Sequence, residues 1–202
     1  MADGTPVLFL PGGINPASLT YSELLPHLGT DVDALLKDHE LYAGEAPPPG
    51  WTLDTEVHAI LAAANARRWS TFHVVAYSGG GGVALALLEV QGERVRSSAL
   101  VEPAWVGKPA SPEELEEYEG VLQGDASDVV GFMAAFMGAP RDAFEQMPDW
   151  MRKRPAGLQA FGREFLRRDL NAAKLRELHT PILLALGEKS APVEHFRAKR
   201  LS

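Results

Sequence analysis

The chain has 202 residues, of which 46% are hydrophobic and 23% charged, a composition that suits one globular domain and excludes a disordered chain. Its formal net charge of -8 does not favour nucleic acid or an anionic membrane surface as a partner. The absence of cysteine excludes disulfides, thiolate metal sites and a cysteine nucleophile. Neither a signal-like segment nor an apolar run of about 18 residues, the length of a membrane span, is present, so we expect a soluble, cytoplasmic protein.

Five short apolar runs are typical of strands that are buried on both faces of a sheet. They are Val7–Leu10, Ala34–Leu36, Phe72–Ala76, Ala99–Val101 and Ile182–Leu186. Helical spacing lies between them at Tyr21–Leu28, which Pro26 limits to a turn or two, and at Val57–Ala64 and Val83–Val90. Strands that alternate with helices predict right-handed crossovers and a mainly parallel α/β sheet.

The alternation stops between residues 103 and 179, a stretch too long for an ordinary crossover. Ser111 followed by Glu114 predicts a capping box, with Pro112 at the first helical position. Phe and Met side chains then recur at helical spacing over residues 132–137. We therefore predict a helical lid insertion at residues 103–179 on an α/β core formed by residues 1–102 and 180–202.

The predicted insertion also contains a basic run, Arg152-Lys153-Arg154. Such a run indicates a solvated face, with contact to an anionic end of a substrate as the alternative. The apolar side chains of the insertion either pack against the core or suit apolar ligands of varied shape.

A single serine stands between a predicted buried strand and an apolar helix. Residues 72–83 read Phe-His-Val-Val-Ala-Tyr-Ser-Gly-Gly-Gly-Gly-Val. This segment resembles the nucleophile elbow, G-x-S-x-G, of the α/β-hydrolase superfamily, with Ala76 in place of the first glycine. The resemblance implies that Ser78 is the nucleophile and sits in strained backbone above the sheet. A glycine run can cradle a phosphate instead, but the patterns G-x-G-x-x-G with a following acid and G-K-[ST] are both absent.

A second glycine loop, Pro11-Gly12-Gly13, follows the first predicted strand. It resembles the oxyanion loop of the same superfamily, with Pro11 where histidine is common. The resemblance implies that the backbone N–H groups of Gly13 and Gly79 form the oxyanion hole. Alone, Pro-Gly-Gly is more often a simple turn, and its significance here comes from its position ahead of the serine elbow.

The resemblance also implies an acid at one of two strand ends. Glu102 follows Ala99–Val101, and Glu188 lies just after Ile182–Leu186, where many relatives carry aspartate at the position of Ser190. We favour Glu102 over Glu188. The alternative for Glu102 is a structural carboxylate that caps a helix or pairs with an arginine.

The catalytic histidine of the superfamily follows one more strand and has no evident counterpart. The six histidines of the chain are His27, His39, His58, His73, His179 and His195. Only His39 and His195 follow predicted strands on the catalytic edge, and either is more often a surface or core residue than a base. Because Ile182–Leu186 would form an uncharged open edge, we expect the sequence to be a C-terminally truncated copy.

The resemblance implies serine-dependent hydrolysis of a small-molecule ester or related acyl substrate with an apolar part. It implies no metal and no organic cofactor, and it leaves the oligomeric state open. The alternative is a non-catalytic ligand-binding protein, or an inactive fragment of a hydrolase, in which the elbow and the insertion form only a pocket.

Overall fold

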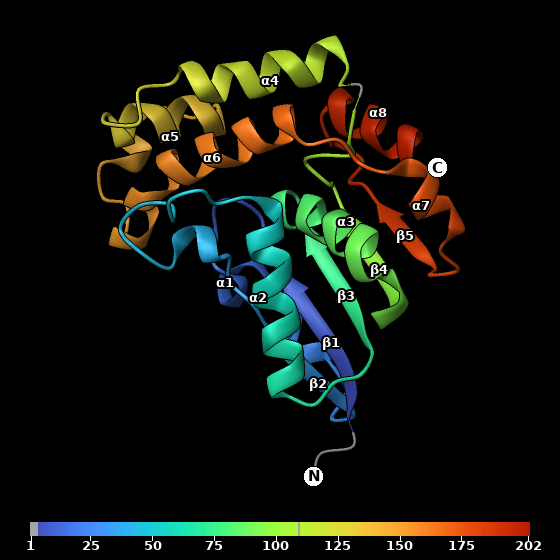
Figure 1. The fold of residues 1–202 in the computed structure, drawn as a ribbon. Coiled ribbons are helices and arrows are strands. Elements are labelled where there is room, and N and C mark those ends of the chain that lie inside the picture. Colours follow the sequence, from blue (N-terminus) through green and yellow to red (C-terminus); the bar gives the residue numbers. More distant parts are fainter. Residues whose placement is uncertain (1–3, 109) are drawn as a thin grey trace.

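The structure, a computed structural model, describes residues 4–108 and 110–202 and contains one parallel five-stranded sheet in the order β2-β1-β3-β4-β5 (Figure 1). The strands are β1 (Thr5–Leu10), β2 (Val32–Leu36), β3 (Phe72–Tyr77), β4 (Val95–Val101) and β5 (Ile182–Ala185). All five predicted strands are confirmed, and so is the α/β class with its parallel sheet. Because the strands are parallel, their carboxyl ends share one edge, where residues 11–13, 78 and 102 follow β1, β3 and β4.

Helices cover both faces of the sheet. In front of the strands in Figure 1 lie α2 (Leu53–Ala66) and α3 (Gly79–Gln91), and α3 begins four residues earlier than its predicted apolar core.

The predicted helix at Tyr21–Leu28 is wrong in position, because the α-helical turn is α1 (Ala17–Thr20) and only a 3₁₀ turn, η1 (Leu25–His27), follows. Tyr21 ends α1 and donates a hydrogen bond of 2.6 Å to the Leu10 carbonyl oxygen.

The segment between β4 and β5 is helical, as its spacing predicted. Its helices are α4 (Pro112–Gln123), α5 (Val129–Met137), α6 (Arg154–Arg167) and α7 (Ala172–Glu177), and α8 (Pro192–Leu201) follows β5. The predicted capping box is confirmed, since Ser111 N donates to Glu114 Oε2 at 2.7 Å and Glu114 N donates to Ser111 Oγ at 3.2 Å. Helices α4, α5 and α6 lie together over the carboxyl ends of the central strands (Figure 1).

The remaining 3₁₀ turns are η2 (Glu40–Tyr42), η3 (Gly92–Arg94), η4 (Arg141–Phe144) and η5 (Asp149–Lys153). The prediction that every strand is buried on both faces is wrong for the outer two. Each residue of β2 is only half-buried, and Ile182 and Leu183 of β5 are 41% and 64% exposed. Within residues 4–108 and 110–202, none of the helices has the length and hydrophobicity needed to cross a bilayer.

Candidate active site

Ser78 occupies the turn between β3 and α3 in a backbone conformation that few non-glycine residues adopt. Its φ is 50° and its ψ is −117°. Three backbone hydrogen bonds hold it there: Ser78 N donates to Val101 O at 2.9 Å, and Ser78 O accepts from Gly81 N at 2.8 Å and Ala104 N at 3.0 Å. Backbone strain of this kind persists only where the surrounding structure imposes it, and it is found most often at functional sites.

Close packing of the elbow explains why position 80 is glycine. A Cβ atom on Gly80 would overlap the carbonyl oxygen of Pro11 and would lie 2.8 Å from that of Leu10. The loop after β1 therefore passes directly against the start of α3. Position 76 is not restricted to glycine, since it carries the methyl group of Ala76, which is fully buried within the sheet.

The same packing brings the two predicted oxyanion donors together. A Cβ atom on Gly79 would lie 3.3 Å from the backbone nitrogen of Gly13. Gly79 is the first residue of α3, so its N–H has no partner inside the helix, and the helix dipole adds positive potential at this end. In the described part of the chain, neither N–H donates a hydrogen bond to another group. Both can therefore donate to a bound oxygen atom.

A cavity of about 600 Å³ opens beside Ser78, Gly79 and Gly13. Most of its wall is apolar and comes from helices that are far from Ser78 in sequence. The methionine and phenylalanine side chains in this wall are Met133, Phe136, Met137, Phe144, Met151, Phe161 and Phe165. An apolar cavity with a few convergent polar groups is the usual form of a small-molecule site.

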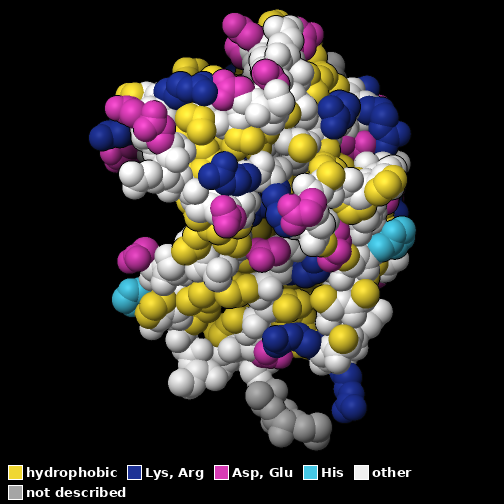
Figure 2. Space-filling view, turned by 90° about the vertical axis from the view of Figure 1, so that its left-hand side faces the viewer, with side chains coloured by type: hydrophobic (Ala, Val, Ile, Leu, Met, Phe, Trp, Pro, Cys, Tyr) yellow, Lys and Arg dark blue, Asp and Glu magenta, His cyan; other side chains and the backbone are white. Residues whose placement is uncertain are grey.

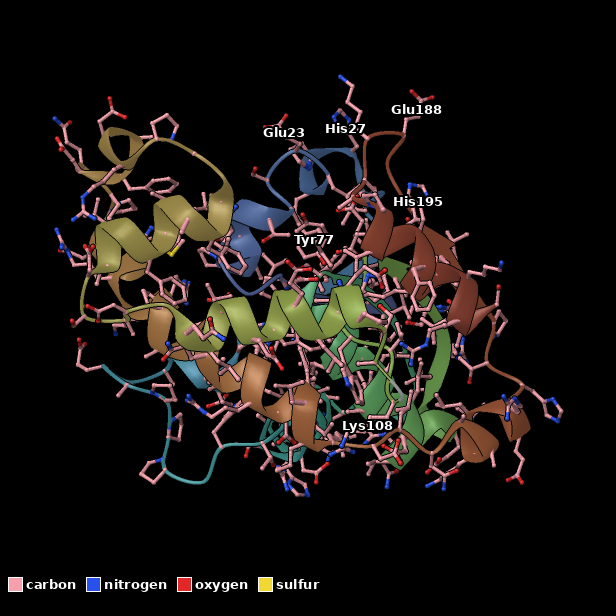
Figure 3. The ribbon with its side chains drawn as sticks, turned by 90° about the horizontal axis from the view of Figure 1, so that it is seen from above. Glu23, His27, Tyr77, Lys108, Glu188 and His195 are labelled. Carbon is pink, nitrogen blue, oxygen red and sulfur yellow. The ribbon has the colours of Figure 1, made fainter. Side chains whose placement is uncertain are left out.

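Glu102, the predicted acid, also has a positive φ, 46°, and its N–H donates to Ala185 O at 3.0 Å. Its carboxylate accepts a short hydrogen bond from Ser190 Oγ, so the loops after β4 and β5 meet at this point. In the residues described, no arginine or lysine lies within 4.0 Å of Glu102 and it caps no helix, and Glu102 is not among the residues that line the cavity beside Ser78. Glu188 is exposed and points away from the central Tyr77 in Figure 3.

None of the histidines in the described residues lines the cavity beside Ser78. His39 is buried behind the loop after β1, where its Nε2 lies 2.9 Å from Pro11 O. His195 is exposed on α8 and projects outward at the rim of the molecule (Figure 3). The structure thus places Ser78, Gly13 and Gly79 around one cavity and keeps both candidate bases out of it.

Two carboxylates of the cavity wall were missed from the sequence, Glu117 of α4 and Glu194 in the first turn of α8, and Glu194 is the more deeply buried of the two. Glu194 Oε1 accepts from Arg197 Nη1 at 3.0 Å, whereas its Oε2 is buried without a hydrogen-bond partner in the described residues. Burial raises the pKa of Glu194 to about 7, and the nearby charges of Glu117 and Glu102 add to the rise while Arg197 opposes it. The available signal was an acid at the start of a helix that follows a strand end.

No group of three or more histidine, aspartate or glutamate side chains in the described residues is placed to hold a metal ion.

Comparison with known proteins gives no matching family model and no matching curated protein. Solved structures do match. An α/β hydrolase enzyme from a Medee basin deep-sea metagenome library superposes with a TM-score of 0.74 at 13% identity, over 100% of this chain and 78% of that one.

Two further solved structures agree in the same way. A thermophilic esterase from Thermogutta terrifontis gives a TM-score of 0.73 at 20% identity, and the match covers 98% of this chain and 78% of the esterase. A hydrolase from Pseudomonas aeruginosa gives a TM-score of 0.68 at 24% identity, and the match covers 98% of this chain and 80% of the hydrolase. The chain has the α/β-hydrolase fold. In this α/β-hydrolase fold, the elbow carries Ser78 and the first loop carries Gly13.

Proposed function

We propose that the chain is a serine-dependent hydrolase of an ester or related acyl substrate with an apolar part. Ser78 is the nucleophile, and the N–H groups of Gly13 and Gly79 stabilise the oxyanion. The observation that supports this most is the positive φ of Ser78 at a strand-to-helix turn that opens into the apolar cavity. In this proposal residues 103–179 form the lid, since many apolar side chains of the cavity wall come from them.

The proposed reaction has two steps. Ser78 Oγ attacks the acyl carbon and loses its proton, the carbonyl oxygen becomes an oxyanion, and the alcohol leaves with a proton as the acyl-serine forms. Water then attacks the acyl-serine, which releases the acid and restores the Ser78 hydroxyl. Both steps need a group in the cavity that accepts a proton and returns it.

We assign this proton transfer to Glu194. It lines the cavity together with Ser78, one of its oxygens has no partner among the described residues, and burial raises its pKa to about 7. Glu102 is the proposed acid of the site and acts through Glu194, whose pKa its negative charge helps to raise. Because no histidine of the described residues lines the cavity and one oxygen of Glu194 is already paired with Arg197, we expect slow ester turnover and regard covalent labelling of Ser78 as the more sensitive measurement.

The test is reaction of the full 202-residue chain with a fluorophosphonate probe, followed by mass spectrometry of the labelled peptide. We expect stoichiometric labelling at Ser78, none in Ser78→Ala, and a rate that rises as the pH passes about 7. The Glu194→Gln variant keeps the size of the side chain and should label at least about tenfold more slowly. Absence of labelling in the unmodified chain, or equal labelling in Ser78→Ala, would contradict the proposal.

A non-catalytic ligand-binding protein is the second candidate function, and the lack of a histidine in the cavity wall of the described residues favours it. It predicts saturable binding of an apolar ester without covalent labelling. Calorimetric titration with a non-hydrolysable ester analogue, beside the probe reaction, separates the two functions.

A further inference from the structure

A second cavity, of about 880 Å³, lies behind the loop that carries Gly13. Gly12 and Asn15 line both cavities, so this loop is the partition between them. The rest of the wall comes from the region around η2, residues 37–45, and from residues 149–154 at the start of α6. Figure 2 shows this side of the molecule, on which basic and acidic side chains are interspersed rather than separated by sign.

Arg154 is the unusual residue of this wall. Its side chain is buried, with 5% of the residue exposed. The guanidinium carbon lies 3.8 Å from the centroid of the Tyr42 ring and 5.2 Å from that of Trp150. In the part of the chain that the structure describes, no carboxylate lies within 4.0 Å of its nitrogens, and Nε is buried without a hydrogen-bond partner. Burial lowers the pKa of Arg154, as expected for a desolvated cation.

The other basic groups of the wall already have partners. Each of the three pairs with a glutamate or aspartate of the same wall, namely Lys37 with Glu40 at 2.6 Å, Lys153 with Glu45 at 3.0 Å and Arg152 with Asp149 at 3.4 Å. The remaining acid, Asp38, accepts a hydrogen bond of 2.6 Å from Ala17 N, and its charge reaches Arg154 only over a longer distance. Of the described cations in this wall, Arg154 alone lacks an anionic partner.

We propose that this second cavity binds a small-molecule carboxylate through Arg154. A buried guanidinium is stable only with hydrogen bonds and a counter-charge. The rings of Tyr42 and Trp150 attract its face, and the Tyr42 side chain also interacts with it through a hydrogen bond, but neither residue brings a negative charge. A carboxylate fits the free edge of the guanidinium with two parallel N–H···O bonds. The wall carries four basic and four acidic side chains, so it favours a singly charged carboxylate over the higher charge of phosphate.

The carboxylate site is connected to the oxyanion loop by one hydrogen bond. Tyr42 Oη donates to Gly13 O at 2.6 Å, and Gly13 also lines the Ser78 cavity. Position 157 is glycine because a Cβ there would overlap the Tyr42 ring, so α6 holds this ring against the guanidinium. Binding at Arg154 uses neither Ser78 nor Glu194, so the proposal stands independently of the proposed function.

The test is calorimetric titration of the full chain with benzoate at constant ionic strength. We expect saturable binding that is about 10- to 100-fold weaker in Arg154→Met, the effect of losing a charge-assisted pair of hydrogen bonds. Arg152→Met is the matched control, because it removes the same charge from the same wall but leaves Arg154, and it should change the affinity by less than about threefold. Ser78→Ala should bind benzoate as the unmodified chain does.

Two further measurements keep the test informative. Arg154→Lys retains the charge if Arg154→Met fails to fold, and it should bind benzoate about 3- to 10-fold more weakly because an ammonium cannot form the two parallel bonds. Inorganic phosphate is the competing probe and should bind less tightly than benzoate. Absence of saturable binding, tighter binding of phosphate, or equal losses in Arg152→Met and Arg154→Met would overturn the proposal.

Discussion

Two buried arginines in this molecule have opposite surroundings. Arg197 of α8 is fully buried among three carboxylates, with Nε 3.2 Å from Glu114, Nη2 2.7 Å from Glu117 and Nη1 3.0 Å from Glu194. Arg154, at the start of α6, is almost as deeply buried, yet it has aromatic rings beside it and no carboxylate within 4.0 Å in the residues described.

The difference indicates that Arg197 has a structural role, whereas the surroundings of Arg154 suit the binding of an anion. Arg197 ties α8 to α4, and acids outnumber bases around it even though Arg200 also pairs with Glu114. Burial raises the pKa of Glu194, and the charges of Glu117 and Glu102 add to the rise while Arg197 opposes it. In the residues described, no carboxylate lies within 4.0 Å of Arg154, so a bound anion would supply the close counter-charge that it lacks.

The largest effect is expected for Arg197→Met. Its removal leaves Glu114, Glu117 and Glu194 close together without their shared cation, so the free energy of unfolding should fall by about 3–5 kcal/mol. Urea denaturation followed by circular dichroism measures the change. Arg200→Met is the matched control, since Arg200 also pairs with Glu114 but is more exposed. An equally large loss of unfolding free energy in both variants would show that burial among three carboxylates does not make Arg197 more important for stability.

The second prediction concerns pH. The pKa of Glu194 is about 7 in the folded chain, against an ordinary value of 4.5, so the folded state binds more protons than the unfolded state between these values. The resulting stabilisation is complete below about pH 4.5 and is lost as the pH rises through about 7. The side chain is 17% exposed, and the loss should be on the order of 1–3 kcal/mol.

The contribution of other titrating groups cancels when the unmodified chain is compared with Glu194→Gln. The difference in unfolding free energy between the unmodified chain and Glu194→Gln, measured in urea from pH 5 to pH 8, isolates the contribution of this carboxyl. A difference that stays constant over that range would mean that Glu194 ionises normally in the folded protein.

The smallest effect on stability is expected for Arg154→Met. No ion pair is lost, the methionine retains much of the apolar contact with Tyr42, and the loss of cation–π attraction is offset by removal of a desolvated charge. The free energy of unfolding should therefore change by less than about 2 kcal/mol. A fall as large as that of Arg197→Met would break the comparison and make Arg154 a structural residue.

Local features of this fold were predictable from the sequence. The strands, the turn at Ser78 and the capping box of Ser111 and Glu114 each depend on residues that are a few positions apart. Tyr21–Leu28 shows the limit of such patterns. Tyr21, Leu25 and Leu28 do pack together in the core, but Pro26 and the hydrogen bond from Tyr21 to Leu10 favour separate turns over one helix.

Long-range electrostatics was not predictable from the sequence. Arg197 lies 83 positions from Glu114, and no local pattern pairs them. The run at residues 152–154 reads as one basic patch, yet the side chain of Arg152 is 56% exposed while Arg154 is buried, because the chain enters α6 at this point. The meeting of Glu102 with Ser190 likewise depends on β4 and β5 being neighbours in the sheet.

The packing of the elbow has a consequence for protein engineering. Position 80 admits only glycine, because the Pro11 carbonyl occupies the space where a side chain would begin. Position 76 tolerates a methyl group, and restoring the glycine of the usual motif there would loosen the strand and cost about 0.5–1 kcal/mol. A designer who transplants this turn into another parallel sheet therefore has to fix one glycine and the path of the neighbouring loop, and is free to choose a small residue two positions before the serine.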